Sequence, residues 1–237
     1  VKKSFLDSDL NKKLLLTSAN SINIARWIPQ MLYYFIAYKN LNTENLKVVF
    51  SVPSGNFGNL CAGMLAKKMG LPVSHFIATT NENDTVPKFM KTGKYKKQKT
   101  ISTITNAMDV GDPSNFVRIL NLYDNKFDKL KKELTAYKFT DKETISGIQK
   151  LYHKSKYLLD PHGATAYLGL KKYLANNPNE IGIFLETAHP IKFLDTVENS
   201  INEKIKIPKH ILKLKKKKKN KIAMKNYEQL KSFLLSR

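Results

Sequence analysis

Residues 46–78 read LKVVFSVPSGNFGNLCAGMLAKKMGLPVSHFIA. The first seven residues are mostly apolar and include several β-branched side chains, which indicates a strand buried on both faces of a parallel sheet. Residues 60–69 then read as a helix that is closed by Gly70, and residues 73–78 read as a second strand. The stretch therefore predicts one βαβ unit.

The loop SGNFGN, residues 54–59, joins the first predicted strand to the helix. Two glycines three residues apart at such a junction let successive backbone N–H groups converge on an anion, which the helix dipole also attracts. We interpret the loop as a phosphate-binding turn. The alternative is a tight strand-to-helix turn in which glycine is needed only for its positive φ. The loop matches neither the Walker A motif nor the G-x-G-x-x-G fingerprint.

Strands and helices also alternate in the rest of the chain. Residues 181–185 (IGIFL) predict a third buried strand. Helices are predicted over residues 22–40, with Ser21 as N-cap and a kink at Pro29, and over 114–122, 127–134, 141–156, 162–174 and the segment that follows Pro190 through 201. This order predicts an α/β fold with helices flanking a parallel sheet and a ligand crevice at the carboxyl ends of its strands.

The composition fits one sizeable cytoplasmic protein. The chain has 237 residues, of which 42% are hydrophobic, and this is enough for a core. Disordered, collagen-like and disulfide-scaffold proteins are thereby excluded, since Cys61 is the only cysteine. The sequence also has no signal peptide pattern and no run of about 20 apolar residues that would cross a bilayer.

The net charge of +22 suggests a polyanion as partner, but the kind of cation argues against this. Lysine accounts for all but three of the 41 cations, whereas nucleic-acid surfaces usually recruit arginine. The excess of Lys and Asn is typical of an AT-rich coding sequence. We therefore interpret KLKKKKK, residues 213–219, as a solvated run, with a nucleic-acid arm as the alternative. We expect a main part over residues 1–207 and a basic, helical tail over 208–237.

Two further segments carry candidate site residues. Thr187 follows the third predicted strand and precedes His189, so its hydroxyl is placed to bond a heterocycle nitrogen in the crevice. His162 lies in an Asp-Pro-His-Gly turn. In both segments the alternative is a helix cap without further function. The five histidines are scattered singly, which predicts no metal site, and no G-x-S-x-G elbow supports a Ser-His-Asp triad.

Six segments taken together resemble one known family. In chain order they are NSIN at 20–23, SVPSGNFGN at 51–59, ATTNENDTVPKFMKTG at 78–93, NAMDVGDPSNFVR at 106–118, LDPHGATAY at 159–167 and TAHPIKF at 187–193. Over about residues 14–207, the chain resembles the threonine synthases, pyridoxal-phosphate enzymes of the tryptophan-synthase-β fold type (fold type II). Separate matches in this order are far more specific than one glycine loop.

The resemblance implies an activity, a cofactor and site residues. Threonine synthases convert O-phospho-L-homoserine and water into L-threonine and phosphate, by γ-elimination and β-addition on pyridoxal 5′-phosphate. The residues implied to bind the cofactor are Gly55, Asn56, Phe57, Gly58 and Asn59 at its phosphate and Thr187 at its pyridine nitrogen. The substrate-side candidates are Asn20, Ser21, Asn23, Ser54, Asn106, Asp109, Asn115, Arg118, His162 and His189.

One departure from the family concerns the Schiff-base lysine. The resemblance places that lysine in an N-terminal half, in a Phe-Lys-Asp segment upstream of Ser-Gly-Asp-Thr-Gly, and neither segment occurs in these residues. Lys88 and Lys192 each precede a phenylalanine but belong to other matched segments. We therefore expect an incomplete gene or one product of a split gene, with no catalytic residue of its own and no turnover without a complementary N-terminal fragment.

The sequence leaves two other functions open. One is another fold-type-II pyridoxal-phosphate lyase, such as a threonine dehydratase or a phospho-lyase. The other is a basic nucleic-acid-binding protein, suggested by the charge and the lysine run.

Overall fold

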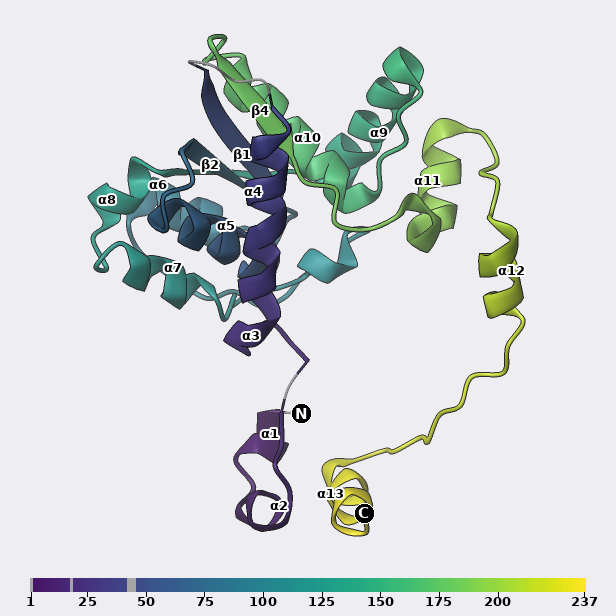
Figure 1. The fold of residues 1–237 in the computed structure, drawn as a ribbon. Helices are drawn as coiled ribbons and strands as arrows, with labels where there is room; N and C mark the ends of the chain where they lie inside the picture. Colours follow the sequence, from purple (N-terminus) through teal and green to yellow (C-terminus); the bar gives the residue numbers. More distant parts are fainter. Residues whose placement is uncertain (1, 18, 42–45) are drawn as a thin grey trace.

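A four-stranded parallel sheet lies at the centre of the molecule (Figure 1). The computed structural model describes residues 2–17, 19–41 and 46–237. The strands are β1 (Lys47–Pro53), β2 (Val73–Thr80), β3 (Leu134–Lys138) and β4 (Glu180–Phe184), in the order β3-β2-β1-β4. Every neighbouring pair is parallel, which confirms the predicted α/β fold.

Strand β1 lies inside the sheet, and its alternate side chains pack against helices on opposite faces. Val48, Phe50 and Val52 point into the larger core, whereas Val49 packs in a separate cluster with Ile77 and Leu170. All four β1 residues are completely buried. Burial on both faces explains why the strand reads as a continuous apolar run.

Helices cover both faces of the sheet. The larger core includes side chains from α4, α5 and α7, while α9, α10 and α11 pack on the other side. The helices are α1 (Lys2–Phe5), α2 (Ser8–Lys13), α3 (Ile24–Trp27), η1 (Ile28–Gln30), α4 (Met31–Lys39), α5 (Gly58–Lys68), α6 (Thr85–Thr92), η2 (Asn106–Met108), α7 (Phe116–Leu122), α8 (Phe127–Lys131), α9 (Asp141–Ser155), α10 (Pro161–Leu174), η3 (Pro190–Phe193), α11 (Leu194–Ile201), α12 (Lys209–Lys215) and α13 (Tyr227–Leu235). In the described part of the chain, no helix has both the length and the apolar character that a membrane span requires.

The helix predicted over residues 22–40 is interrupted where the sequence suggests. Pro29 lies in the 3₁₀ turn η1, which separates α3 from α4. The predicted cap, however, is wrong. Asn23 caps α3 by accepting a hydrogen bond from the N–H of Ala25 at 3.1 Å, while Ser21 lies outside the helix and serves another network.

Strand β3 was not predicted, and the helix predicted over 127–134 ends early. Helix α8 stops at Lys131, and the chain then pairs with β2 from Leu134 onward. Only Leu134 is buried in this edge strand, so the apolar run that marks the other strands is absent. The predicted helix at 141–156 is confirmed as α9, although Thr140 rather than Asp141 is its cap, in a capping box with Glu143.

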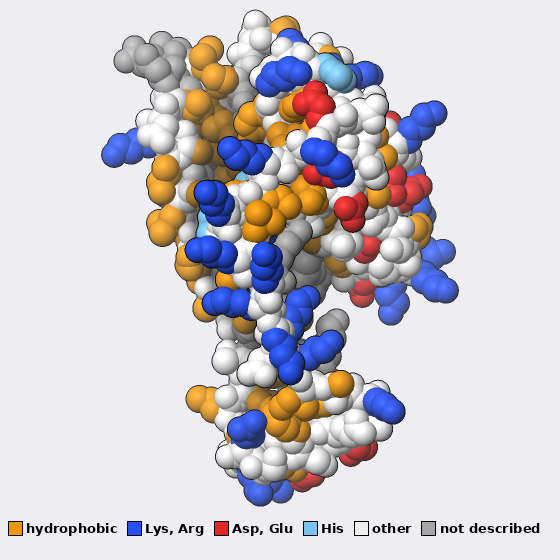
Figure 2. Space-filling view, turned by 90° about the vertical axis from the view of Figure 1, so that its right-hand side faces the viewer, with side chains coloured by type: hydrophobic (Ala, Val, Ile, Leu, Met, Phe, Trp, Pro, Cys, Tyr) orange, Lys and Arg blue, Asp and Glu red, His pale blue; other side chains and the backbone are white. Residues whose placement is uncertain are grey.

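The two ends of the chain lie together, apart from the sheet (Figure 1). Tyr227 of α13 donates a hydrogen bond to Asp7 beside α2 at 2.7 Å, and Lys231 forms ion pairs with Asp7 and Asp9 at 3.0 and 2.6 Å. Residues 208–237, the predicted tail, contain the two helices α12 and α13. Figure 2 shows Lys and Arg side chains as a loose band down one face, with apolar side chains between them.

Candidate active site

The loop after β1 is shaped by close backbone contact. A Cβ atom on Gly55 would lie 2.7 Å from both the carbonyl oxygen of Ala107 and the Cα of Met108, so only glycine fits against η2. Phe57 has a left-handed φ of 62° and turns the chain into α5, whose first residue is Gly58. Direct contact between the backbone of the loop and the backbone of η2 therefore fixes their relative position.

The loop presents unpaired backbone donors. Among the described residues, no protein acceptor receives a hydrogen bond from the N–H groups of residues 55–59. These groups lie at the N-terminus of α5, where the helix dipole adds positive potential. The geometry agrees with the interpretation of SGNFGN as an anion-binding turn.

A cavity of about 700 Å³ opens at this loop. It lies at the carboxyl ends of β1 and β4, which is where the strand order predicts a crevice. Its lining residues are Ser21, Gln30, Tyr33, Ala37, Pro53, Gly55, Asn56, Phe57, Gly58, Asn59, Ala107, Met108, His162, Leu185, Glu186 and Thr187. All six residues predicted to bind the cofactor therefore line one cavity, together with Ser21 and His162 of the substrate-side set.

Tyrosines of α4 fix the side chain of Asn59. The Oδ1 atom of Asn59 accepts hydrogen bonds from the hydroxyls of Tyr33 and of Tyr34, the latter at 2.7 Å. Tyr34 is completely buried. Because the amide oxygen is engaged, the Nδ2 group is the donor that Asn59 keeps for a ligand.

The substrate-side segments 20–23 and 106–118 meet the loop through amides and a hydroxyl. The Oγ atom of Ser21 accepts from Nδ2 of Asn56 at 3.1 Å and from Nδ2 of Asn115 at 3.2 Å. Asn56 in turn accepts from the N–H of Ser114 at 2.7 Å. Arg118 donates to Asn115 and to the Ile22 carbonyl. These contacts hold three distant segments beside the cavity.

Several other predicted residues lie outside the cavity lining. Ser54 is buried and donates to the Val52 carbonyl at 2.9 Å. His189 caps η3 by accepting from the N–H of Ile191. Asn20 and Asn106 are exposed, and Asn23 is half-buried.

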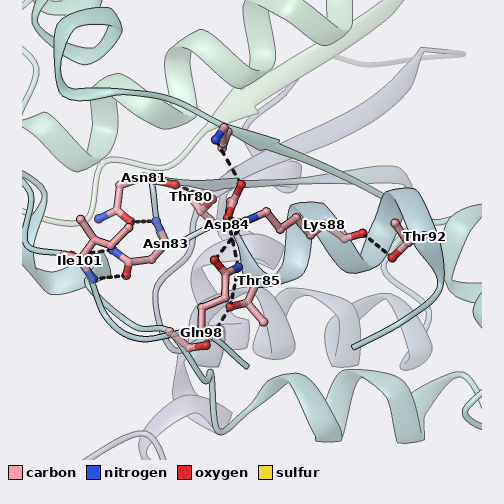
Figure 3. Close-up of polar contacts among 11 residues, drawn as sticks. Thr80, Asn81, Asn83, Asp84, Thr85, Lys88, Thr92, Gln98 and Ile101 are labelled. Carbon is pink, nitrogen blue, oxygen red and sulfur yellow. Dashed lines mark hydrogen bonds and ion pairs between the residues drawn. The ribbon is translucent and has the colours of Figure 1, made fainter. Parts of the chain in front are cut away.

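Asp109 belongs to a buried network rather than to the cavity wall. Its Oδ1 atom accepts from Nδ2 of Asn81 at 2.8 Å and from the Thr103 hydroxyl at 2.8 Å. Asn81 also donates to the Thr105 hydroxyl at 2.9 Å, so it holds the residues on both sides of η2. Figure 3 shows Asn81 next to Asn83, which exchanges hydrogen bonds with the backbone of Ile101. The network fixes the wall that faces Gly55.

Glu186 is a site residue that the sequence analysis missed. It lines the cavity directly before Thr187, and its carboxylate accepts from the Asp160 N–H at 2.7 Å. A Cβ on Gly163 would lie 2.8 Å from the Glu186 carboxyl, so glycine permits this approach to the start of α10. Its position directly after the strand predicted over residues 181–185 was the signal that could have found it.

The pKa of the Glu186 carboxyl is raised toward the neutral pH range. Burial raises the pKa of its carboxyl to about 7, and the negative charge of Asp160 adds to the rise, whereas the Asp160 N–H and the Tyr157 hydroxyl oppose it. In Asp160, burial is outweighed by hydrogen bonds from the His162 ring and backbone, which hold the pKa of that carboxyl below its ordinary value. The pair therefore holds one proton below about pH 7 and loses it above that pH.

Glu186 is expected to make stability depend on pH. The folded state retains a proton that the unfolded chain releases near its ordinary pKa of 4.5, so stability should fall as pH rises from about 4.5 to 7 and then level off. The side chain is only partly buried, and solvent screening reduces the expected loss to about 1–2 kcal/mol. Urea unfolding at pH 5 and pH 8 should show that Glu186→Gln removes this loss. The exposed Glu228→Gln is the control, and an equal reduction in both variants would contradict the assignment.

The chain matches two family models. The model of the pyridoxal-phosphate dependent enzymes matches residues 11–183, and that of the threonine synthase C-terminal region matches 163–234, which includes most of the tail. In the described residues, no group of three or more His, Cys, Asp or Glu side chains is placed to hold a metal.

Curated relatives and solved structures agree with the family models. Threonine synthase of Buchnera aphidicola from Schizaphis graminum is 43% identical over all of this chain and 55% of its own length, and that of Escherichia coli is 45% identical over 89% and 48%. The crystal structure of threonine synthase from Escherichia coli matches with a TM-score of 0.83 and 45% identity over 90% of this chain and 49% of its own. A pyridoxal-phosphate-bound threonine synthase from Brucella melitensis matches with a TM-score of 0.90 and 29% identity over 98% and 55%.

These matches show to which family the chain belongs and how much of its relatives' length it spans. A serine racemase from Dictyostelium discoideum shares 16% identity at a TM-score of 0.51, which shows a common fold alone. The chain spans about half the length of the curated relatives it matches. On this evidence the chain belongs to the pyridoxal-phosphate-dependent enzymes and, among them, is a relative of the threonine synthases.

Proposed function

We propose that the protein is a threonine synthase, which forms L-threonine and phosphate from O-phospho-L-homoserine and water with pyridoxal 5′-phosphate. The observation that carries the proposal is the meeting, in one cavity of about 700 Å³, of the unpaired N–H groups of residues 55–59 with Thr187. The names of the relatives support it. Because the chain spans only about half of each relative, the complete activity belongs to this proposal.

The residues present fit the cofactor. At the N-terminus of α5 the loop offers N–H groups that have no acceptor among the described residues, glycine at position 55 lets the loop lie directly against η2, and Asn59 keeps an amide donor for the same anion. We assign Gly55, Asn56, Phe57, Gly58 and Asn59 to the phosphate and Thr187 to the pyridine nitrogen. When bound, pyridoxal phosphate supplies an electron sink for the bonds broken at the substrate carbon atoms.

The chain's own residues orient the ligands. Ser21, Asn56 and Asn115 share a hydrogen-bond network beside the loop, and we assign their segments to the substrate side. Arg118 holds Asn115 and the Ile22 carbonyl, so its contribution here is to fix this wall. Thr187 supplies a hydroxyl, which does not require the pyridine nitrogen to be protonated.

A reconstitution experiment tests the proposal. The resemblance assigns the Schiff-base lysine to a Phe-Lys-Asp segment that residues 1–237 do not contain. We therefore propose that these residues alone give no turnover, and that adding a polypeptide with the Phe-Lys-Asp and Ser-Gly-Asp-Thr-Gly segments yields threonine and phosphate from O-phosphohomoserine. A folded, cofactor-bound complex without either product would refute the proposed activity.

Product analysis separates the alternatives. A threonine dehydratase-like lyase would release 2-oxobutanoate from threonine. A nucleic-acid-binding protein would shift a labelled oligonucleotide at physiological salt, and the Lys and Arg side chains on the face shown in Figure 2 are the surface that such binding would use. We also propose a cytoplasmic location, in agreement with the free and buried thiol of Cys61.

A further inference from the structure

His162 carries a buried nitrogen that the protein leaves without a partner. Its side chain is 3% exposed, and its Nε2 atom has no hydrogen bond to any described residue. Among the described residues, a few other buried side-chain polar atoms also lack a hydrogen-bond partner. Of these atoms, only Nε2 of His162 belongs to a residue that lines the cavity. A buried polar atom left unpaired is costly, which indicates that a ligand atom completes the pairing.

The imidazole ring is held in one orientation. Its Nδ1 atom lies 2.7 Å from Oδ1 of Asp160, and the ring packs on Phe193 at a centroid distance of 4.8 Å. Asp160 is completely buried and also accepts from the N–H groups of His162 and Gly163 at 2.8 and 3.2 Å. A carboxylate accepts only, so Nδ1 donates to Asp160, and this tautomer leaves Nε2 as the acceptor of the ring.

The surroundings of His162 select the kind of ligand atom. Asp160 is hydrogen-bonded to Nδ1 of the ring, and Glu186 packs against Gly163, the next residue in the first turn of α10. The carboxylate of Asp160 disfavours an anion at this place, while an acceptor nitrogen pairs with an O–H or N–H donor. The phosphate loop comes from β1 and α5, whereas His162 and Thr187 come from α10 and the end of β4.

We propose that Nε2 of His162 accepts a hydrogen bond from the ring end of the bound cofactor and that Asp160 is the positioning residue that aims it. This inference rests on the proposed function, since it places the phosphate end at residues 55–59 and the ring next to Thr187. The proposed contact of His162 with the ring is additional to the one that we assign to the Thr187 hydroxyl.

Two substitutions at residue 162 separate this role from a structural one. His162→Asn keeps a donor at the position of Nδ1 for Asp160 but removes Nε2. His162→Gln places an amide oxygen near the position of Nε2 but gives up the bond to Asp160. The probe is 4′-deoxypyridoxine 5′-phosphate, which has the cofactor ring and phosphate but forms no bond to a lysine.

The affinities are measured on the full-length protein by calorimetry, with inorganic phosphate as the comparison ligand. We expect His162→Asn to bind the probe about 10-fold more weakly and inorganic phosphate within about 2-fold of the parent, and His162→Gln to stay closer to the parent for both. The reverse order, with Asn like the parent and Gln weak, would show that His162 only supports Asp160. Thermal unfolding of each variant establishes that it is folded.

Imidazole ¹⁵N spectra give a second readout that is independent of activity. The chain has five histidines, and the His162 variants assign the signal. We expect an unprotonated Nε2 whose shift changes on saturation with the probe but not with phosphate, and an unchanged shift with the probe would overturn the inference. If the parent binds neither ligand, the proposed function itself fails. If it binds both and the variants bind equally well, only the role of His162 fails.

Discussion

Gly55→Ala is expected to lower the affinity for pyridoxal phosphate at least about 100-fold. The added Cβ would lie 2.7 Å from backbone atoms of Ala107 and Met108, neither of which can rotate away as a side chain would. The loop or η2 must therefore move, and this displaces the N–H groups of residues 55–59 from the positions in which we expect them to bind the cofactor phosphate. Overpacking of this kind also costs about 1–3 kcal/mol of stability. Calorimetric titration and urea unfolding measure the two effects.

Gly147→Ala is the matched control for Gly55→Ala. Gly147 lies within α9, and a Cβ there would approach only the side chain of Leu168, at 3.1 Å. Alanine also favours a helix interior by up to about 1 kcal/mol. We expect unchanged cofactor affinity in this variant. An equal loss in both variants would mean that Gly55 acts through the backbone entropy common to all glycines and not through its contact with η2.

Asn81→Leu is expected to destabilise the protein by about 3 kcal/mol and to weaken cofactor binding. The change removes the hydrogen bonds that the Asn81 amide makes with Asn83, Thr105 and Asp109. Asn83 and Thr105 are buried, and Asp109 is half-buried. Buried groups left unpaired cost about 1–3 kcal/mol each, with partial relief from relaxation. Because Asn81 holds both sides of η2, the wall against Gly55 should loosen as well.

Asn121→Ala provides the comparison for Asn81→Leu. Asn121 is an exposed residue of α7, where alanine is the better helix former. Chemical unfolding should therefore show little change or a small gain for this variant, with unaltered cofactor affinity. If Asn81→Leu unfolds at the parent's urea midpoint, the hydrogen bonds of Asn81 to Thr105 and Asp109 do not make the contribution to stability that we assign to them.

The sequence predicts the fold and the site best where residues that are neighbours in the chain carry the signal. The unit over residues 46–78 is marked by an apolar strand, a glycine loop and a helix, and all three are found in place. Strand β3 has no such mark, because an edge strand buries little and its pairing with β2 is a tertiary event. Helix α6 was likewise missed, since it is only eight residues long and contains Pro87 in its first turn.

The contacts that shape the cavity could not be read from spacing along the chain. Glu186 and Asp160 are 26 positions apart, and Asn56 reaches Ser114 across 58. Asp109 was predicted on the substrate side from its motif, yet its carboxylate is engaged by Asn81 and Thr103. A motif assigns a segment to a site, whereas the direction of each side chain is decided by folding.

The cavity wall has a consequence for how ligands affect the whole protein. Its residues come from positions 21–37, 53–59, 107–108, 162 and 185–187, which meet only when the sheet and both helical layers are assembled. A partly unfolded molecule therefore has no site, and a ligand binds the native state alone. By mass action, ligand at 100 times its Kd adds about 2.7 kcal/mol to the unfolding free energy. Even β3, which contributes no lining residue, becomes harder to unfold when the cavity is filled.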